Sequence, residues 1–366
     1  MPTWQSSHTS WQARSRLTTC PALSGWTGRQ PYRHAGWPSS RTGAGRLPRS
    51  EENEQVAKYT TLDQIDLPVV AQRYGLKDPR LAPLAGGAAN SSFRITSAAD
   101  EFVLTILDNH DTASAERLAA HTQALFLLGV PTVAVVPAAD GSVITHFDDR
   151  PVILKAWADG TVEQPLPEVL LPEAGRILAE LHALPPQSVG LTDIPVGTRR
   201  LSADHEALIP GFADRSFADW LVDQLARVHR VEAVSHRPRT ITHGDLFDDN
   251  IIVGADGALT VLDWETVSLD DPLLDLGMAA VGLAQEDGSL AAPRLNALVE
   301  GYERACPLAE ADRRALPTEI IHAALIIAFH RYYRHNVRFP DATKSDYHLE
   351  MIKFVESVAG AAEVLG

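Results

Sequence analysis

The feature that most constrains this chain is a pair of short apolar runs between two polar side chains. Residues 251–253 and 259–262 are apolar and flank the sequence Gly-Ala-Asp-Gly at 254–257, a turn signal of the kind that joins two strands into a β-hairpin. A hairpin returns on itself, so we expect Asp263 to lie beside Asn250.

A third polar residue, Asp245, precedes Asn250 by five positions. The three side chains can therefore converge on one point. Such a set suits phosphoryl transfer, in which one Asp accepts the proton of the attacking hydroxyl while an Asn and another Asp hold Mg²⁺ on the nucleotide phosphates. An Asp-rich turn is more often a solvated loop. The spacing and the hairpin length together make a Mg²⁺-nucleotide site as well supported as a solvated loop.

The sequence around these residues resembles a known family. Three motifs are similar to the aminoglycoside phosphotransferase and choline kinase superfamily: His-Gly-Asp-Leu-x-x-x-Asn at 243–250, Leu-Asp-Trp-Glu at 262–265 and Asp-Pro-x-x-Asp-Leu at 271–276. Its members are small-molecule kinases that share the protein-kinase fold. The segments 58–62, 86–93 and 102–107 resemble the bacterial type II homoserine kinases, and the likeness extends from about residue 59 to about residue 336.

The resemblance implies an α+β, two-lobed, protein-kinase-like fold with a small antiparallel β lobe and a larger, mostly helical lobe. It also implies ATP and Mg²⁺ as cofactors, with Asp245 as the catalytic base and Asn250 and Asp263 as the metal ligands. His243 is expected to support the catalytic loop. Asp275 is expected to accept hydrogen bonds from that loop's backbone or from His243.

A Gly-containing connection upstream provides the expected phosphate-binding loop. Gly86 and Gly87 allow the backbone to approach a phosphate closely, and the expected nucleotide site adds Asn90 and Ser91. A Gly-Gly pair between strands is by itself more often an ordinary hairpin turn. The functional interpretation depends on the downstream Asp-Asn-Asp set.

One departure from the superfamily concerns a lysine. Most members place a Lys on the third strand to pair with the α/β-phosphates, whereas this chain has Thr105 there, as type II homoserine kinases do. Glu116, the helix acid that would pair with such a Lys, is then expected to be a surface residue. Lys155 could compensate, although we expect a strand lysine that faces solvent.

A second departure concerns the acceptor. Trp264-Glu265 is commoner in choline, sugar and antibiotic kinases than in homoserine kinases. Glu265 and Asp270 are therefore candidate ligands for a substrate ammonium, while Asp271 is expected to cap a helix. Three arginines near the C-terminus could bind a substrate carboxylate or could be helix-end charges: Arg331, Arg334 and Arg338.

Composition restricts the partners. The formal net charge of the 366-residue chain is −15, which argues against nucleic acid, because phosphate contacts require Lys and Arg. A small polar substrate is expected instead. The longest apolar run near the C-terminus, 323–329, is too short to span a bilayer. Two cysteines, Cys20 and Cys306, are too few for a disulfide framework, so we expect a cytoplasmic protein.

We expect a disordered extension at 1–55, a small nucleotide-binding lobe at 56–165 and a helical catalytic and substrate lobe at 166–366. The N-terminal segment is rich in Arg, Ser and Trp and shows no sustained period. The predicted strands lie at 80–85, 92–96, 101–107, 133–137, 143–145 and 152–157, the last resembling the family's adenine-binding hinge. The predicted helices lie at 63–74, 113–128, 173–184, 217–229, 273–283, 291–305 and 318–335.

The leading interpretation is an ATP- and Mg²⁺-dependent kinase for a hydroxyl on a small metabolite, with homoserine as the best single substrate. Another small molecule (an amino alcohol, a hexosamine or an aminoglycoside) is an alternative acceptor. A serine/threonine protein kinase and a non-catalytic nucleotide-binding regulator also remain open.

Overall fold

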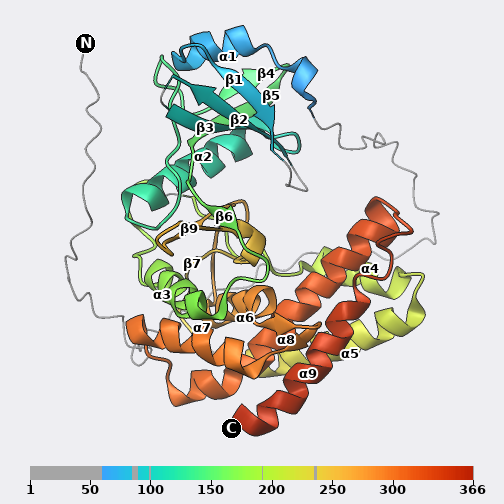
Figure 1. Ribbon diagram of the computed structural model, residues 1–366. Helices are drawn as coiled ribbons and strands as arrows, with labels where there is room; N and C mark the ends of the chain where they lie inside the picture. Colours follow the sequence, from blue (N-terminus) through green and yellow to red (C-terminus); the bar gives the residue numbers. More distant parts are fainter. Residues whose placement is uncertain (1–59, 85–89, 99, 192, 235–236, 366) are drawn as a thin grey trace, which may run out of the picture.

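The chain forms two lobes joined by a short linker, as the computed structural model shows (Figure 1). The structure describes residues 60–84, 90–98, 100–191, 193–234 and 237–365, with side chains to residue 360. The expected extension at 1–55 lies outside these residues, as do Gly86 and Gly87.

The small lobe is built on a five-stranded antiparallel sheet with the strand order β1-β2-β3-β5-β4. The strands are β1 (Arg80–Pro83), β2 (Ser91–Ser97), β3 (Asp100–Ile106), β4 (Thr145–Phe147) and β5 (Arg150–Ala156). Side chains alternate between the two faces along each strand. On one face Phe93, Leu104 and Leu154 are buried against α1 (Leu67–Tyr74) through Val70.

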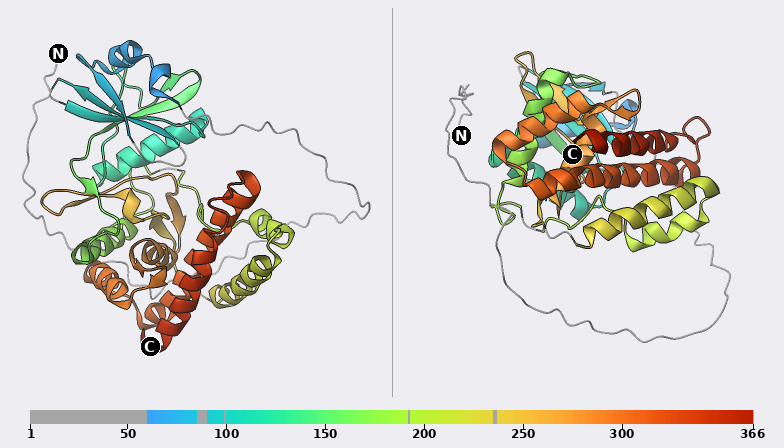
Figure 2. Two further views of the ribbon diagram at one scale, coloured as in Figure 1. Left: turned by 45° about the vertical axis from the view of Figure 1, so that its right-hand side comes forward. Right: turned by 90° about the horizontal axis from the view of Figure 1, so that it is seen from below.

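The opposite face of this sheet is covered in part by α2 (Thr112–Leu127), which lies between the sheet and the large lobe (Figures 1 and 2). Ala115 and Ala119 of α2 pack with Ile153 of β5. Asp111 caps the helix by accepting the N–H of Ser114 at 2.7 Å. The part of this face that α2 leaves uncovered looks toward the large lobe.

The linker that leaves β5 joins the sheet of the large lobe directly. Its strand β6 (Thr161–Val162) pairs with β8 (Ile251–Val253), and β8 pairs with β9 (Leu259–Val261). Gly160 has φ +148°, and a Cβ there would lie 2.3 Å from the carbonyl oxygen of Val253. Only glycine lets the linker approach β8 this closely.

The large lobe is mostly helical, and one continuous apolar core fills it. Helices α5, α8 and α9 lie side by side when the molecule is viewed from below (Figure 2). Two two-stranded sheets accompany the helices, one of β7 (Thr240–Thr242) with β10 (Ser268–Asp270) and one of β11 (Gln285–Glu286) with β12 (Ser289–Leu290). The helices are α3 (Leu171–His182), α4 (Ala203–Leu208), α5 (Arg215–Glu232), α6 (Pro272–Leu283), α7 (Ala292–Ala305), α8 (Glu310–Tyr332) and α9 (Leu349–Leu365).

Two sequence-based elements differ in the structure. Residues 133–137 do not form a strand, because only Val135 makes an isolated bridge, to Lys155. The helix predicted at 318–335 begins instead at Glu310 and accommodates Pro317 in its interior; after Tyr332 the chain widens into a π-helix (Tyr333–Arg338). Within the described residues, no helix is both long enough and apolar enough to cross a membrane.

Candidate active site

The predicted hairpin is confirmed. Ile251 is paired with Val261, and the N–H of Leu262 donates to the carbonyl of Asn250 at 2.8 Å. Gly257 has φ +80° and closes the turn by donating to the carbonyl of Gly254 at 2.9 Å. This pairing places Asp263, the residue that follows Leu262, next to Asn250.

The loop that carries Asp245 is held by Asp275, a buried acid in the first turn of α6. Its carboxylate accepts the N–H groups of His243 at 2.8 Å and Gly244 at 2.7 Å. It also contacts Nε2 of His182 at 2.9 Å. Burial raises the pKa of Asp275, but the hydrogen bond and charge interaction with His182, together with smaller contributions from His243 and Gly244, hold it below its ordinary value.

His243 fixes the loop from the other side. Its Nε2 contacts the carbonyl of Leu262 at 3.0 Å, and its Nδ1 accepts the N–H of Asp245 at 3.1 Å. The ring also lies 4.6 Å from the ring of Trp264. These contacts occupy both ring nitrogens, so the geometry suits a support for the loop better than a group that transfers protons.

Asp245 is half-buried, and one of its carboxylate oxygens accepts a hydrogen bond from Arg199 at 2.7 Å. Arg199 reaches this position because residues 195–197 run beside β10. Leu269 donates to the carbonyl of Pro195, and Gly197 donates to that of Leu269. Arg199 was not among the sequence candidates. The signal for it was the Arg-Arg pair at 199–200 in an otherwise acidic body.

The residues expected to hold a metal have the donor chemistry for it. Asn250 Nδ2 donates to the carbonyl of Asp245 at 2.9 Å, so the amide oxygen is the atom left for a ligand. The side chain of Asp263 is exposed, yet the surrounding protein desolvates it enough to raise its pKa, and the charge of Glu265 adds to this. Hard oxygen donors in a locally acidic site suit Mg²⁺.

The acidity extends to Asp249, whose pKa is raised by desolvation and then by the charges of Asp245 and Asp248. Carboxylates that raise one another's pKa gain stability from a cation. Asp263 itself has φ +60°, a backbone conformation that L-residues rarely adopt and that recurs at functional sites.

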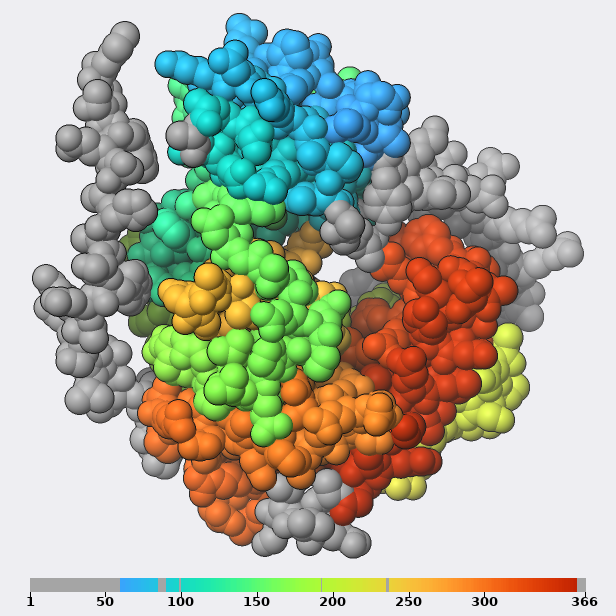
Figure 3. Space-filling model, in the orientation of Figure 1, coloured from blue at the N-terminus to red at the C-terminus, as the bar shows by residue number. Residues whose placement is uncertain are grey.

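The expected phosphate loop is described only in part. Ser91 is buried, and its hydroxyl donates to Asp108 at 2.7 Å and accepts the N–H of Thr60 at 2.8 Å. Its side chain is therefore engaged within the small lobe. Asn90 donates to Glu265 across the gap between the lobes. The space-filling view shows a hollow between the small lobe and the C-terminal helices (Figure 3).

Neither acid proposed for a substrate ammonium is free. Asp270 is buried, and its carboxylate accepts Nε of Arg200 at 2.7 Å. Glu265 accepts Asn90 and lies 3.6 Å from His110. Both acids are thus engaged by other side chains of the protein, and their recognition of the acceptor stays a prediction.

Two of the three C-terminal arginines are engaged by other side chains. Arg331 pairs with Glu350 at 2.8 Å, and Arg338 stacks 5.1 Å from the ring of Phe339. Arg334 is exposed at the start of the π-helix. Of the basic residues considered, Arg199 is the one in contact with the expected catalytic base.

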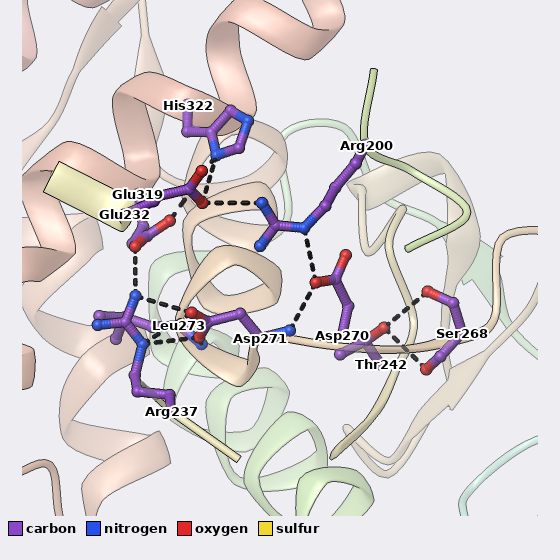
Figure 4. Close-up of polar contacts among 10 residues, drawn as sticks. All are labelled: Arg200, Glu232, Arg237, Thr242, Ser268, Asp270, Asp271, Leu273, Glu319 and His322. Carbon is purple, nitrogen blue, oxygen red and sulfur yellow. Dashed lines mark hydrogen bonds and ion pairs between the residues drawn. The ribbon is translucent and has the colours of Figure 1, made fainter. Parts of the chain in front are cut away.

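A polar network joins β10 and the start of α6 to α5 and α8 (Figure 4). Arg200 bridges Asp270 and Glu232. Arg237 bridges Asp271, which caps α6 by accepting the N–H of Leu273, and Glu319 of α8. These charge-assisted contacts fix the start of α6 and hence the position of Asp275.

Comparisons with known proteins bear on the family and the fold of this chain. The profile of the phosphotransferase enzyme family, APH, matches residues 80–308, more than half of the chain. A homoserine kinase of Hyphomonas neptunium is 26% identical over 259 residues, which is 66% of this chain and 77% of that protein.

Solved structures share the fold. An amicoumacin kinase in complex with AMP-PNP and Ca²⁺ matches with a TM-score of 0.61 and 12% identity, covering 82% of this chain and 94% of that one. A microcompartment-associated aminopropanol kinase matches with a TM-score of 0.55 and 20% identity, covering 81% and 97%. The predicted two-lobed, protein-kinase-like fold is confirmed.

Proposed function

Since the chain belongs to the phosphotransferase enzyme family, we propose that it transfers the γ-phosphoryl group of ATP to the hydroxyl of homoserine. Phosphoryl transfer from ATP to a hydroxyl follows from the family. The acceptor is our inference, and the observation that carries it is the 2.7 Å contact between Arg199 and Asp245. This contact places a cation beside the base that meets the acceptor hydroxyl.

In the proposed reaction, Asp245 orients the acceptor hydroxyl and takes its proton as the oxygen–phosphorus bond forms. The bond between the γ-phosphorus and the β–γ bridging oxygen breaks, and ADP leaves. A loose transition state requires little proton abstraction, so orientation is the larger contribution of Asp245. Asn250 and Asp263 would hold Mg²⁺, which neutralises charge on the phosphates when bound.

The acceptor side favours a substrate that carries a carboxylate. Arg199 Nε is buried and has no hydrogen-bond partner among the described residues, so the guanidinium retains donor capacity beyond its contact with Asp245. His330 lies close enough that Arg199 affects it. Burial, then the charges of Arg199 and His205, lower the pKa of His330 to about 4. A neutral histidine beside Arg199 leaves the arginine as the cation for an incoming carboxylate.

A second acceptor class, an amino alcohol without a carboxylate, is favoured by Trp264-Glu265 and by the likeness in fold to an aminopropanol kinase. Homoserine and 3-amino-1-propanol distinguish the two, because both offer an amine and a primary hydroxyl, and only homoserine has the carboxylate.

The test is ADP release with ATP, Mg²⁺ and each acceptor in turn. We expect turnover of homoserine, loss of turnover when EDTA removes divalent metal, and a much lower kcat/KM for 3-amino-1-propanol. A panel that includes a hexosamine, an aminoglycoside and a serine-containing peptide covers the other acceptors. Preference for 3-amino-1-propanol over homoserine would refute the substrate, and activity of Asp245→Ala equal to wild type would refute the mechanism.

A further inference from the structure

The small-lobe face that looks toward the large lobe lacks a cation at the expected place. Thr105 of β3 is buried, and its hydroxyl lies 3.4 Å from that of Ser92 on β2. A nucleotide in the cleft brings several negative charges close to Asp263 and Glu265. Some positive charge besides the metal is needed to balance them.

The strand register shows which side chain can supply that charge. Lys155 of β5 is paired with Val103 of β3, and Thr105 is paired with Ile153. Directly paired residues project from the same face of an antiparallel sheet, so Lys155 and Thr105 share one face. They are diagonal neighbours, a separation of about 7–8 Å that long side chains span.

The surroundings of Lys155 differ from those of a solvent-facing lysine, so the earlier expectation is wrong. The residue is only partly exposed. Burial lowers the pKa of the Lys155 ammonium, and the charges of Asp263 and Glu265 oppose that shift. The side chain therefore lies in the field of the expected metal ligand and its neighbour.

The ammonium of Lys155 nevertheless has no direct partner: this side chain makes no hydrogen bond or ion pair with any residue that the structure describes. The nearby arginines of the same sheet are occupied. Arg94 donates to Glu101 at 2.6 Å and lies 4.5 Å from the ring of Trp157. Arg150 pairs with Asp108 at 3.1 Å. A partly desolvated ammonium without an ion-pair partner is costly unless an anion binds it.

We propose that Lys155 binds the phosphate oxygens of the nucleotide from β5, in place of the lysine that is absent at Thr105. The inference rests on the proposed function, because it assumes that the cleft binds a nucleoside polyphosphate. The superfamily resemblance implies a lysine on β3. The proposal places the same charge on β5 instead, on the same face of the sheet.

The first experiment is calorimetric titration of the full chain with ADP and with adenosine, each with and without Mg²⁺. Lys155→Met keeps the length of the side chain and removes its charge. We expect ADP to bind roughly 10- to 100-fold more weakly and adenosine to bind as it does to wild type. The matched control is Lys77→Met, since Lys77 is an exposed lysine of the same lobe.

Two further variants separate charge from packing. Lys155→Arg keeps the charge and is expected to recover most of the ADP affinity. Thr105→Lys in the Lys155→Met background moves the ammonium to the diagonal position and is also expected to restore ADP binding. The midpoint of thermal unfolding of Lys155→Met should be no lower than that of wild type, because an unpaired, partly buried ammonium is replaced by an apolar side chain.

Equal loss of adenosine and ADP affinity in Lys155→Met would show that Lys155 only shapes the pocket, and unchanged ADP affinity would show that it does not reach the phosphates. Either result overturns the proposal. If the wild-type protein bound neither ADP nor adenosine, both the proposed function and the role of Lys155 would be refuted. If wild type bound ADP but phosphorylated none of the acceptors, the substrate would be wrong and the role of Lys155 would still be decided by these titrations.

Discussion

Replacement of Asp275 by Asn is the most direct test of how the active-site loop is held. The side chain is 1% exposed and accepts three hydrogen bonds, from His243 N, Gly244 N and His182 Nε2. Asparagine has the same shape but only one acceptor oxygen. Whichever way its amide is turned, its NH₂ group faces a backbone N–H, so at least one buried donor loses its partner.

The expected loss of stability follows from the number of hydrogen bonds that Asp275 accepts. A hydrogen bond to a charged group contributes about 1.5–3 kcal/mol, and an orphaned buried donor costs about 1–3 kcal/mol more. We therefore expect Asp275→Asn to lower the free energy of unfolding by roughly 3–5 kcal/mol. With a urea m-value of roughly 3 kcal/mol/M for a chain of this size, the unfolding midpoint should fall by about 1 M or more.

The assay is urea unfolding followed by far-UV circular dichroism at pH 7, with ADP release measured on the same samples. Asp219→Asn is the matched control, because Asp219 is an exposed acid on α5 without a described partner, and its effect should stay within about 0.5 kcal/mol. A midpoint for Asp275→Asn within about 0.2 M of wild type would falsify the view that this carboxylate holds the loop.

Three further results are expected. Asp245→Asn should lower kcat by about 10²- to 10⁴-fold in the ADP-release assay with little change in unfolding midpoint; a kcat within a factor of three would count against its role. Gly301→Ala should destabilise the protein by roughly 1–3 kcal/mol or more in urea unfolding, because the new Cβ would overlap the carbonyl oxygen of Pro172. Gly360 is exposed and has open space around it, so Gly360→Ala should be neutral or stabilising. Burial raises the pKa of Glu232, but hydrogen bonds and charges from His322 and Arg200 outweigh it and lower the pKa from 4.5 to about 2. The stability that the ionised carboxylate contributes is therefore full above pH 4.5 and declines toward pH 2, so Glu232→Gln should cost at most about 3 kcal/mol at pH 7 and less than half of that at pH 3. An equal cost at both pH values would contradict this origin.

The sequence predicts the local elements well where pattern and turn chemistry agree. The hairpin at 251–261 and the helices α2, α6 and α7 were found within one or two residues of their bounds, since their caps and turn glycines are explicit. Residues 133–137 have strand-like composition, yet most of the segment lies outside the sheet's hydrogen-bond ladder. The helix predicted at 318–335 begins earlier, at Glu310, because α8 includes Pro317 in its interior.

The polar partners were harder to predict, because they depend on tertiary contacts. His182 lies 93 positions from Asp275 and Arg199 lies 46 positions from Asp245, and no local pattern connects either pair. Asp270 looked available for a substrate in the sequence, but Arg200 occupies it. Lys155 looked solvent-facing because strand alternation alone does not say which face another lobe covers.

The pairing of β6 with β8 has a mechanical consequence for nucleotide exchange. Since Thr161 and Val162 are hydrogen-bonded into the large lobe, an opening of the cleft must bend the chain at residues 157–160. The rear of the small lobe is anchored as well, by Val261 N to the carbonyl of Pro131 and by Trp264 Nε1 to the hydroxyl of Thr132. Departure of ADP then depends on rotation about this short pivot, and the Asn90–Glu265 hydrogen bond is a contact between the lobes that such a rotation would separate.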